Sequence, residues 1–234
     1  QHQRFWEEPP STVAHVTSAG LSSAGHPLLG ATTALADSDG FLFTGRLSRQ
    51  DEPWLSDHAV FGTVLFPGVG LLELALTAAR SLGGSTVSSL TLAAPMVIPA
   101  KDPLRLQVSV KPPDGDGIRE LTVFSQQEEN SEDVGWNQHA MGSISTEEQP
   151  EPVVCPELMV WPPAGGESVD LSELYDGLGA AGLDYGPMFQ GLEEAYFVGD
   201  TAYGLVVLPE KLQGSAESYG VHPALFDAAL HTMV

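Results

Sequence analysis

The sequence predicts an α+β fold in which antiparallel strands surround a buried helix. The helix is expected after Pro67, because residues 71–79 are apolar on nearly every side and such a helix needs cover from other structure. Strand-like runs separated by turn clusters follow it, as expected for an antiparallel meander. These runs lie at 89–98, 104–110, 119–125 and 136–145.

The residues before that helix predict a lead-in and the first strand. Residues 1–25 are rich in Pro, Ser, Gly and Thr and have little periodicity, so we expect a lead-in linker from a preceding domain. Residues 41–47 predict a strand, and residues 51–58 predict a loop that leads toward the helix. Together with the helix and the meander, they predict an N-terminal unit at 26–146 of the kind called a hot dog.

A second unit with loosely the same order of elements is predicted at 168–234. It follows an exposed linker at 147–167 that is rich in proline and acidic residues. Asp170 is expected to cap its first helix, because an aspartate side chain accepts hydrogen bonds from the free amides of a first turn. The expected elements are a helix at 171–181, strands at 192–198 and 202–208, and an apolar helix from Pro223.

The second unit is predicted to be incomplete at its C-terminal end. Only residues 231–234 follow its apolar helix, whereas the first unit has its meander at that point. A helix without covering strands exposes apolar surface, at a cost of about 25 cal/mol per Å². We therefore expect that about three strands are missing or are supplied by another segment.

Composition narrows the class of protein. With 31 acidic and 9 basic residues the formal net charge is −22, which disfavours nucleic acid and anionic membranes as partners. Cys155 is the single cysteine, so no internal disulfide or cysteine-based metal cluster is expected. No apolar run approaches the length of a membrane span, and the first residues lack the pattern of a secretory signal. A cytoplasmic location is the default expectation.

His58 is the first candidate catalytic residue. Alone it is compatible with a structural histidine, but Pro67 suits the first turn of the following helix, and Gly68 leaves an amide unobstructed there. A carbonyl oxygen placed at that amide would be polarised by the positive helix end. The segment therefore combines an imidazole with a carbonyl site.

Asp227 and His231 form the second candidate group. Asp227 lies in the first turns of the last helix, where a carboxylate is also compatible with a simple helix-end charge. His231 follows four residues later on the same helix face, within reach of Asp227. The apolar neighbours of Asp227 favour the neutral carboxylic acid, the form that donates a proton. The pair alone lacks companions for a metal site.

Tyr185 is the third candidate, within the segment Tyr185-Gly-Pro-Met-Phe189. Turn chemistry and a core phenylalanine account for much of this segment. The tyrosine hydroxyl is additionally suited to hydrogen-bond a substrate oxygen. Nucleotide-binding glycine loops and the Gly-x-Ser-x-Gly elbow of serine hydrolases do not occur.

Three ordered motifs resemble those of the dehydratase domains of modular type I polyketide synthases. They are His58-x-x-x-Gly62-x-x-x-x-Pro67, Tyr185-Gly-Pro-x-Phe189 and Asp227-x-x-x-His231. The first six residues also resemble the end of the linker that leaves a preceding acyltransferase. The resemblance covers essentially the whole chain and implies a double hot-dog fold in which His58 faces Asp227.

The resemblance also implies an activity, which is that of a hydro-lyase acting in polyketide chain elongation. The substrate would be a β-hydroxyacyl thioester on the phosphopantetheine arm of an acyl carrier protein, and the domain would need no cofactor of its own. His58 would act as base and Asp227 as acid, with Tyr185, Gly68 and His231 in support. Neighbouring synthase domains would be partners in cis, and a homodimer is plausible by family.

Two alternatives remain open at this point. The first is a bifunctional domain that dehydrates and then adds an internal hydroxyl to the new double bond, closing a pyran ring. It needs the same acid and base, so the motifs do not exclude it. The second is a scaffold that binds acyl chains without catalysis. Substrate length, stereochemistry and product geometry depend on the shape of the tunnel and cannot be read from the sequence.

Overall fold

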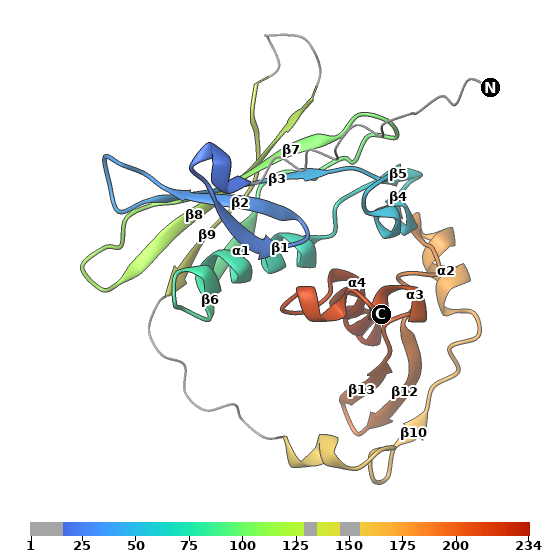
Figure 1. Cartoon of the computed structure of the whole chain (residues 1–234). Helices are drawn as coiled ribbons and strands as arrows, with labels where there is room; N and C mark the ends of the chain where they lie inside the picture. Colours follow the sequence, from blue (N-terminus) through green and yellow to red (C-terminus); the bar gives the residue numbers. More distant parts are fainter. Residues whose placement is uncertain (1–15, 129–134, 146–154) are drawn as a thin grey trace, which may run out of the picture.

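A computed structural model describes residues 16–128, 135–145 and 155–234 (Figure 1). Most of the expected lead-in and the first part of the expected linker at 147–167 lie outside these ranges. The described elements fall into two parts. They meet where helix α1 (Gly68–Ser81) packs against helix α4 (Pro223–Leu230), and also through a small sheet with strands from both parts. Among the described residues, no helix is long and apolar enough to cross a bilayer.

The N-terminal part is built on a seven-stranded antiparallel sheet with strand order β1-β2-β3-β7-β8-β9-β6. The strands are β1 (Ser22–His26), β2 (Leu29–Ala34), β3 (Phe41–Leu47), β6 (Thr86–Leu92), β7 (Leu104–Val110), β8 (Ile118–Gln127) and β9 (Asn137–Ser145). Side chains of β7 alternate between buried and more exposed positions, because successive residues of a strand face opposite sides of the sheet. One face of the sheet therefore covers the core.

Two predicted boundaries in this part differ from the structure. Strand β1 starts at Ser22, inside the range 1–25 assigned to a lead-in, and pairs with β2 at the edge of the sheet. Strand β6 ends at Leu92 instead of continuing over the predicted 89–98. The reason is tertiary, since the chain beyond Ala94 leaves β9 and pairs with the segment before α1, Val97 with Leu65 and Met96 with Phe66.

Helix α1 (Gly68–Ser81) is the buried helix that the sequence predicted after Pro67. It packs against β6, β7 and β9, along one face of the large sheet (Figure 1). Its apolar side chains join one core with those of the sheet. Leu74, Ala75, Ala78 and Ala79 are fully buried. A helix that is apolar nearly all round needs this enclosure, so the hot-dog arrangement of the first half is confirmed.

The C-terminal part has a smaller sheet of three strands in the order β10-β12-β13. Its elements are η3 (Pro156–Met159), β10 (Glu167–Ser168), α2 (Leu174–Ala180), β12 (Leu192–Val198), β13 (Thr201–Val206), α3 (Glu210–Gln213), η4 (Ala216–Ser218), α4 (Pro223–Leu230) and η5 (His231–Met233). Met233 and Val234 are largely exposed. Among the described residues, this half thus has fewer covering strands than the first.

The predicted helix at 171–181 starts later than expected. Asp170 Oδ1 accepts a hydrogen bond from the Ser172 amide at 2.9 Å, which forms a local turn instead of a helix cap. The helix itself begins at Leu174, behind Glu173, whose side chain makes no capping bond. An aspartate favours turns and helix caps for the same reason, and the sequence prediction chose the wrong one of the two.

A third, small sheet joins the two halves, with strand order β11-β4-β5. Its strands are β4 (His58–Val60), β5 (Thr63–Val64) and β11 (Leu183–Tyr185), and the 3₁₀ helix η2 (Pro53–Asp57) leads into it. The predicted loop at 51–58 is therefore mostly this helix. Strands β4 and β11 are antiparallel, and Tyr185 lies directly opposite His58. Backbone pairing thus sets two of the predicted site residues side by side.

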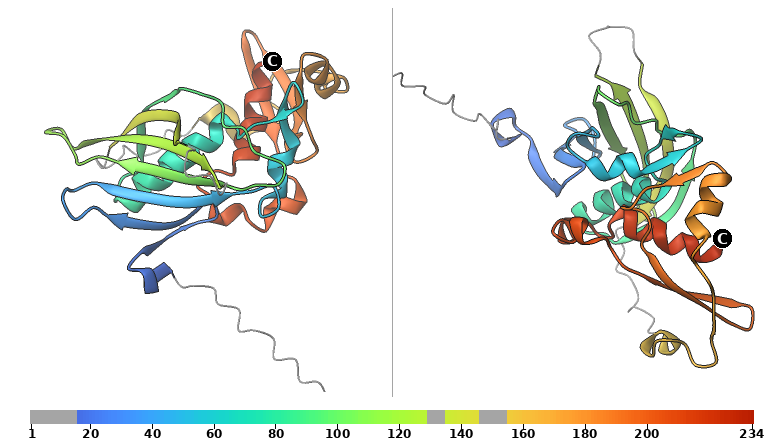
Figure 2. Two further views of the ribbon diagram at one scale, coloured as in Figure 1. Left: turned by 90° about the horizontal axis from the view of Figure 1, so that it is seen from above. Right: turned by 90° about the vertical axis from the view of Figure 1, so that its right-hand side faces the viewer.

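Helix α4 of the second half packs against α1 of the first, as Figure 2 shows from two sides. Glu73 of α1 lies at this contact and is 2% exposed. Its carboxylate accepts hydrogen bonds from the amides of Gly220 at 2.6 Å and Val221 at 3.1 Å, immediately before α4. Glu73 Oε1 also lies 3.3 Å from His26 Nε2. The carboxylate therefore ties the start of α4 to the first half.

Burial acts to raise the pKa of Glu73, but the contacts with His26 and with the two backbone amides outweigh it and leave that pKa below its usual value. The folded protein thus stabilises the charged form of Glu73. A buried carboxylate with several donors is costly to disturb, because a variant leaves those donors without an acceptor.

We expect Glu73→Gln to lower the free energy of unfolding by about 2 kcal/mol, since the amide supplies one acceptor oxygen where two backbone N–H groups need one each. A chain of this size should then lose roughly 4 to 8 °C in melting temperature. Thermal unfolding followed by circular dichroism measures this. The matched control is Glu120→Gln, whose carboxylate is 68% exposed beside Lys111 and should change little. Equal melting temperatures for the two variants would contradict the role of Glu73.

Candidate active site

His58 begins strand β4 and is 8% exposed. Its Nδ1 lies 2.9 Å from the carbonyl oxygen of Leu65. Since a carbonyl oxygen only accepts, Nδ1 carries the proton, and Nε2 keeps its lone pair. That Nε2 is 3.9 Å from Oδ2 of Asp227. The structure therefore brings together the two residues that the sequence proposed as base and acid, 169 positions apart in the chain (227 minus 58).

Asp227 lies on α4 and is 7% exposed. Its Oδ2 is buried and, within the described part of the chain, has no hydrogen-bond partner. Nε2 of His231 approaches the same oxygen to 3.5 Å from the next turn. The predicted pairing on one helix face is present, and a carboxyl oxygen lies between two imidazoles.

Tyr185 completes the cluster from strand β11. Its ring packs edge-on against His58 at 5.5 Å between centroids and lies 4.4 Å from the ring of His231. Burial, together with the nearby charge of Asp227, raises the pKa of Tyr185 to about 12. The phenol thus stays protonated at neutral pH and is a hydrogen-bond donor.

The tyrosine segment is held to the first half by Asp57. The amide of Met188 donates to Asp57 Oδ2 at 2.9 Å, and the amide of Gly186 donates to the Asp57 backbone oxygen at 2.7 Å. A side chain at Gly186 would place its Cβ 2.5 Å from the Asp57 carboxyl carbon, closer than Cβ atoms are found. The glycine after Tyr185 is therefore required by this close approach.

Gly68 opens helix α1 beside His58. Both residues line one cavity of about 330 Å³, together with Leu71, Leu92 and Met96. Amides of a first helical turn lack an acceptor within the helix, and the helix dipole is positive at this end. A carbonyl group bound in the cavity near Gly68 would lie within the same apolar space as the His58 imidazole.

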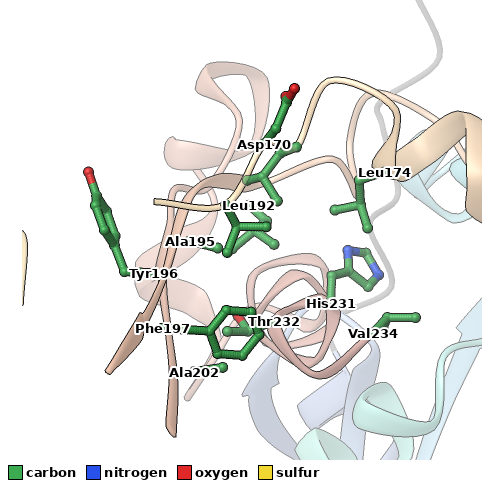
Figure 3. Close-up of a pocket in the computed structure, with 12 residues that line it drawn as sticks. Asp170, Leu174, Leu192, Ala195, Tyr196, Phe197, Ala202, His231, Thr232 and Val234 are labelled. Atoms are coloured by element: carbon green, nitrogen blue, oxygen red, sulfur yellow. The ribbon is translucent and has the colours of Figure 1, made fainter. Parts of the chain in front are cut away.

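A second cavity, of about 160 Å³, lies behind His231 (Figure 3). Figure 3 shows the His231 imidazole beside the side chains of Leu174 and Val234. The cavity continues over Leu192 and Phe197 of the three-stranded sheet. His231 is 3% exposed, so its imidazole belongs to the interior.

The sequence did not identify four residues that support the site. Two are Asp57 and Glu73, and the others are Tyr175, whose hydroxyl lies 3.4 Å from Nδ1 of His231, and His222, which caps α4. Glu73 was recognisable, because a lone acid in a helix apolar on all sides has to find donors when it is buried. His222 was also recognisable as a helix start from the proline that follows it. No local pattern identifies Asp57 or Tyr175, since their partners lie far away in the sequence.

The fold and the site define a class of protein. It is a double hot dog in which a histidine from one half faces an aspartate from the other. A family model described as polyketide synthase dehydratase domain matches residues 26–126, and one described as polyketide synthase dehydratase N-terminal domain matches residues 156–234. The chain belongs to the dehydratase domains of polyketide synthases.

Similar proteins agree with this assignment. The polyketide synthase GfsE of Streptomyces halstedii is 44% identical over 99% of the chain, which spans 6% of that synthase. The dehydratase domain from the terminal module of the rifamycin polyketide synthase has a TM-score of 0.87 at 39% identity, covering 93% of this chain and 78% of that one.

A third structure, the dehydratase domain of the CurK module of the curacin polyketide synthase, has a TM-score of 0.76 at 31% identity, covering 88% of this chain and 72% of that one. Two further structures of it are described as inactive mutants, one with an aspartate changed to asparagine and one with a histidine changed to phenylalanine.

His222 holds the start of the helix that carries Asp227. Its Nδ1 accepts a hydrogen bond from the amide of Ala224 at 3.1 Å, so the imidazole is the N-cap of α4. Burial lowers the pKa of His222 to about 4, against the opposing charge of Glu73. Protonation of Nδ1 would remove the acceptor and the cap.

We expect the protein to lose stability as the pH falls from about 6.5 to about 4, because His222 takes up a proton in this range when unfolded but not when folded. His222→Asn keeps a capping acceptor and does not titrate, so its melting temperature should fall less over the same range. Melting curves of both proteins between pH 7 and pH 4 measure the difference. Parallel curves would show that His222 does not contribute.

Proposed function

We propose that this chain is a hydro-lyase that removes water from a β-hydroxyacyl thioester and leaves an α,β-unsaturated thioester during polyketide chain elongation. One observation carries the proposal: the unprotonated Nε2 of His58 and the carboxyl of Asp227 converge to 3.9 Å at a buried site. A base and an acid at this separation suit the two proton transfers of a dehydration.

In the proposed reaction, His58 Nε2 takes the α-proton of the substrate. The electron pair of that C–H bond forms the new double bond as the bond from the β-carbon to its hydroxyl breaks. Asp227 gives its proton to the departing hydroxyl, which leaves as water. Each proton transfer to or from a positioned side chain typically contributes about 10²- to 10⁴-fold.

Three neighbours support these steps. The amide of Gly68 polarises the thioester carbonyl at the positive end of α1, which makes the α-proton easier to remove. The Tyr185 hydroxyl, protonated at neutral pH, donates a hydrogen bond to the departing oxygen. His231 approaches Asp227 Oδ2 to 3.5 Å and orients that carboxyl group.

The inactive mutants of the CurK dehydratase support the assignment of the acid and the base, since one lacks a histidine and the other an aspartate. In this chain, the buried histidine and aspartate that face each other from the two halves are His58 and Asp227. We assign them the corresponding roles.

The substrate and partners follow from family membership. We propose that the acyl chain arrives on the phosphopantetheine arm of an acyl carrier protein in the same cytoplasmic synthase, and that the reaction uses no further cofactor. A chain of charge −22 has little basic surface to attract an acidic carrier protein. Linkage in cis offsets this by holding the carrier at an effective concentration in the millimolar range.

We expect His58→Ala and Asp227→Asn each to slow dehydration by at least about 10²-fold, since each removes one proton transfer. The assay incubates the protein with a carrier-bound β-hydroxyacyl substrate and follows by mass spectrometry the loss of one water. The exposed Asp200→Asn serves as the matched control and should react at the wild-type rate. Wild-type turnover by either site variant would refute the assignment.

The alternative of a dehydratase that also closes a pyran ring is tested with a second substrate. Similar solved structures include a bifunctional dehydratase-cyclase domain, so likeness alone does not separate the two activities. With a β-hydroxyacyl thioester that carries a distal hydroxyl, we expect only the linear unsaturated product. The cyclic product has the same mass, so NMR of the isolated product distinguishes them, and a ring would establish the second activity. Binding of the substrate without any loss of water would instead favour the scaffold.

A further inference from the structure

Tyr175 lies outside every predicted motif. It contacts His231 at Nδ1, the ring nitrogen that does not face Asp227. It belongs to the first turn of α2, and its ring packs edge-on against the ring of His231, with 5.6 Å between centroids. Its hydroxyl oxygen is 3.4 Å from Nδ1 of His231. The same oxygen accepts a hydrogen bond from the amide of Leu192 at 3.3 Å. Burial raises the pKa of Tyr175, which keeps the phenol protonated.

These contacts indicate where the hydroxyl proton of Tyr175 points. An amide N–H only donates, so the Leu192 amide occupies a lone pair of the Tyr175 oxygen. The contacts of this oxygen include no carbonyl or carboxylate that could accept the hydroxyl hydrogen, so we direct that hydrogen to Nδ1 of His231, the remaining partner. In a neutral imidazole one nitrogen is a donor and the other an acceptor, so an accepting Nδ1 requires that Nε2 carry the proton. That Nε2 faces Asp227 Oδ2 at 3.5 Å.

We propose that Tyr175 is a positioning residue that sets the tautomer of His231 and thereby the orientation of the Asp227 carboxyl. The inference rests on the proposed function only where it concerns turnover. With Nε2–H of His231 directed at Oδ2, that oxygen is the accepting one, and the acidic proton lies on Oδ1, free for transfer to the substrate. In the other tautomer, a lone pair of Nε2 would face Oδ2 and compete for the same proton.

The surroundings of His231 leave its tautomer to be set by the protein rather than by water. His231 and Asp227 are 3% and 7% exposed, so bulk water has little access to correct a wrong tautomer. The cavity behind His231 is lined largely by apolar side chains such as Leu174 and Leu192 (Figure 3). Within the described residues, the hydroxyl of Tyr175 is the polar group that contacts Nδ1 of His231.

The test is Tyr175→Phe, which removes the hydroxyl and keeps the ring. In ¹⁵N NMR spectra of the imidazoles, we expect wild-type His231 as the Nε2–H tautomer, and the variant with a substantial Nδ1–H population. The signals of His231 are assigned by their loss in His231→Gln. An unchanged Nε2–H tautomer in Tyr175→Phe would overturn the proposal. Because this measurement needs no substrate, it stands even if the proposed dehydration is not observed.

Kinetics supply the second measurement. Tyr175→Phe should lower kcat about tenfold and leave KM within about twofold, because the substrate contacts are retained. In the His231→Gln background the same change should have no further effect, since an amide donates from one nitrogen and has no tautomer. An equal loss of kcat in both backgrounds would show a merely structural role for the hydroxyl.

Tyr196→Phe is the matched control. It removes a hydroxyl that is bonded to Glu194 at 3.1 Å and lies on the same side of the second half. It should change neither the tautomer of His231 nor kcat. A tautomer change in Tyr196→Phe as large as that in Tyr175→Phe would also overturn the proposal, because the effect would then not depend on contact with Nδ1.

Discussion

The buried carboxylate of Glu73 is the interaction on which the arrangement of this protein depends. A carboxylate at the centre of an apolar contact must find donors, and the amides of Gly220 and Val221 supply them from the other half of the chain. Helix α1 therefore cannot slide against α4 without breaking charge-assisted hydrogen bonds. Because Asp227 lies just over one turn into α4, its distance to His58 follows from this contact.

The other connections between the halves also use backbone hydrogen bonds. Strand β11 pairs with β4 and places Tyr185 opposite His58, and Asp57 holds the following turn through the amides of Gly186 and Met188. The site thus consists of side chains on segments that are each held at their backbone. Such support keeps catalytic groups in position more firmly than side-chain packing alone, which is what proton transfer over short distances requires.

The sequence predicted what local patterns determine. The structure confirms the helix after Pro67 and the strands predicted at 41–47 and 104–110. These elements were predictable because the residues that bury one helix or one face of a sheet recur at regular intervals in the sequence. The end of β6 and the start of α2 were wrong, since distant pairing partners and a local turn decide them. The contacts of Glu73 and Tyr175 were not predictable, because each joins residues from different segments.

Two of the buried polar atoms that lack a hydrogen bond lie at the proposed site, and others, such as Thr32 Oγ1 and Arg119 Nε, lie elsewhere in the described residues. Within the described residues, Oδ2 of Asp227 and Nε2 of His231 are buried without a hydrogen bond, an arrangement that costs about 1 to 3 kcal/mol for each group. These two atoms lie 3.5 Å apart, slightly beyond a normal N–H···O hydrogen bond, so a small approach in the proposed tautomer of His231 would pair them with each other. The hydrogen bonds of Glu73 and Asp57 offset the cost by holding the two halves together in the absence of substrate. The hydrogen bonds that fix the two halves thus lie outside the reacting pair, and the polar atoms of that pair are only loosely paired with each other.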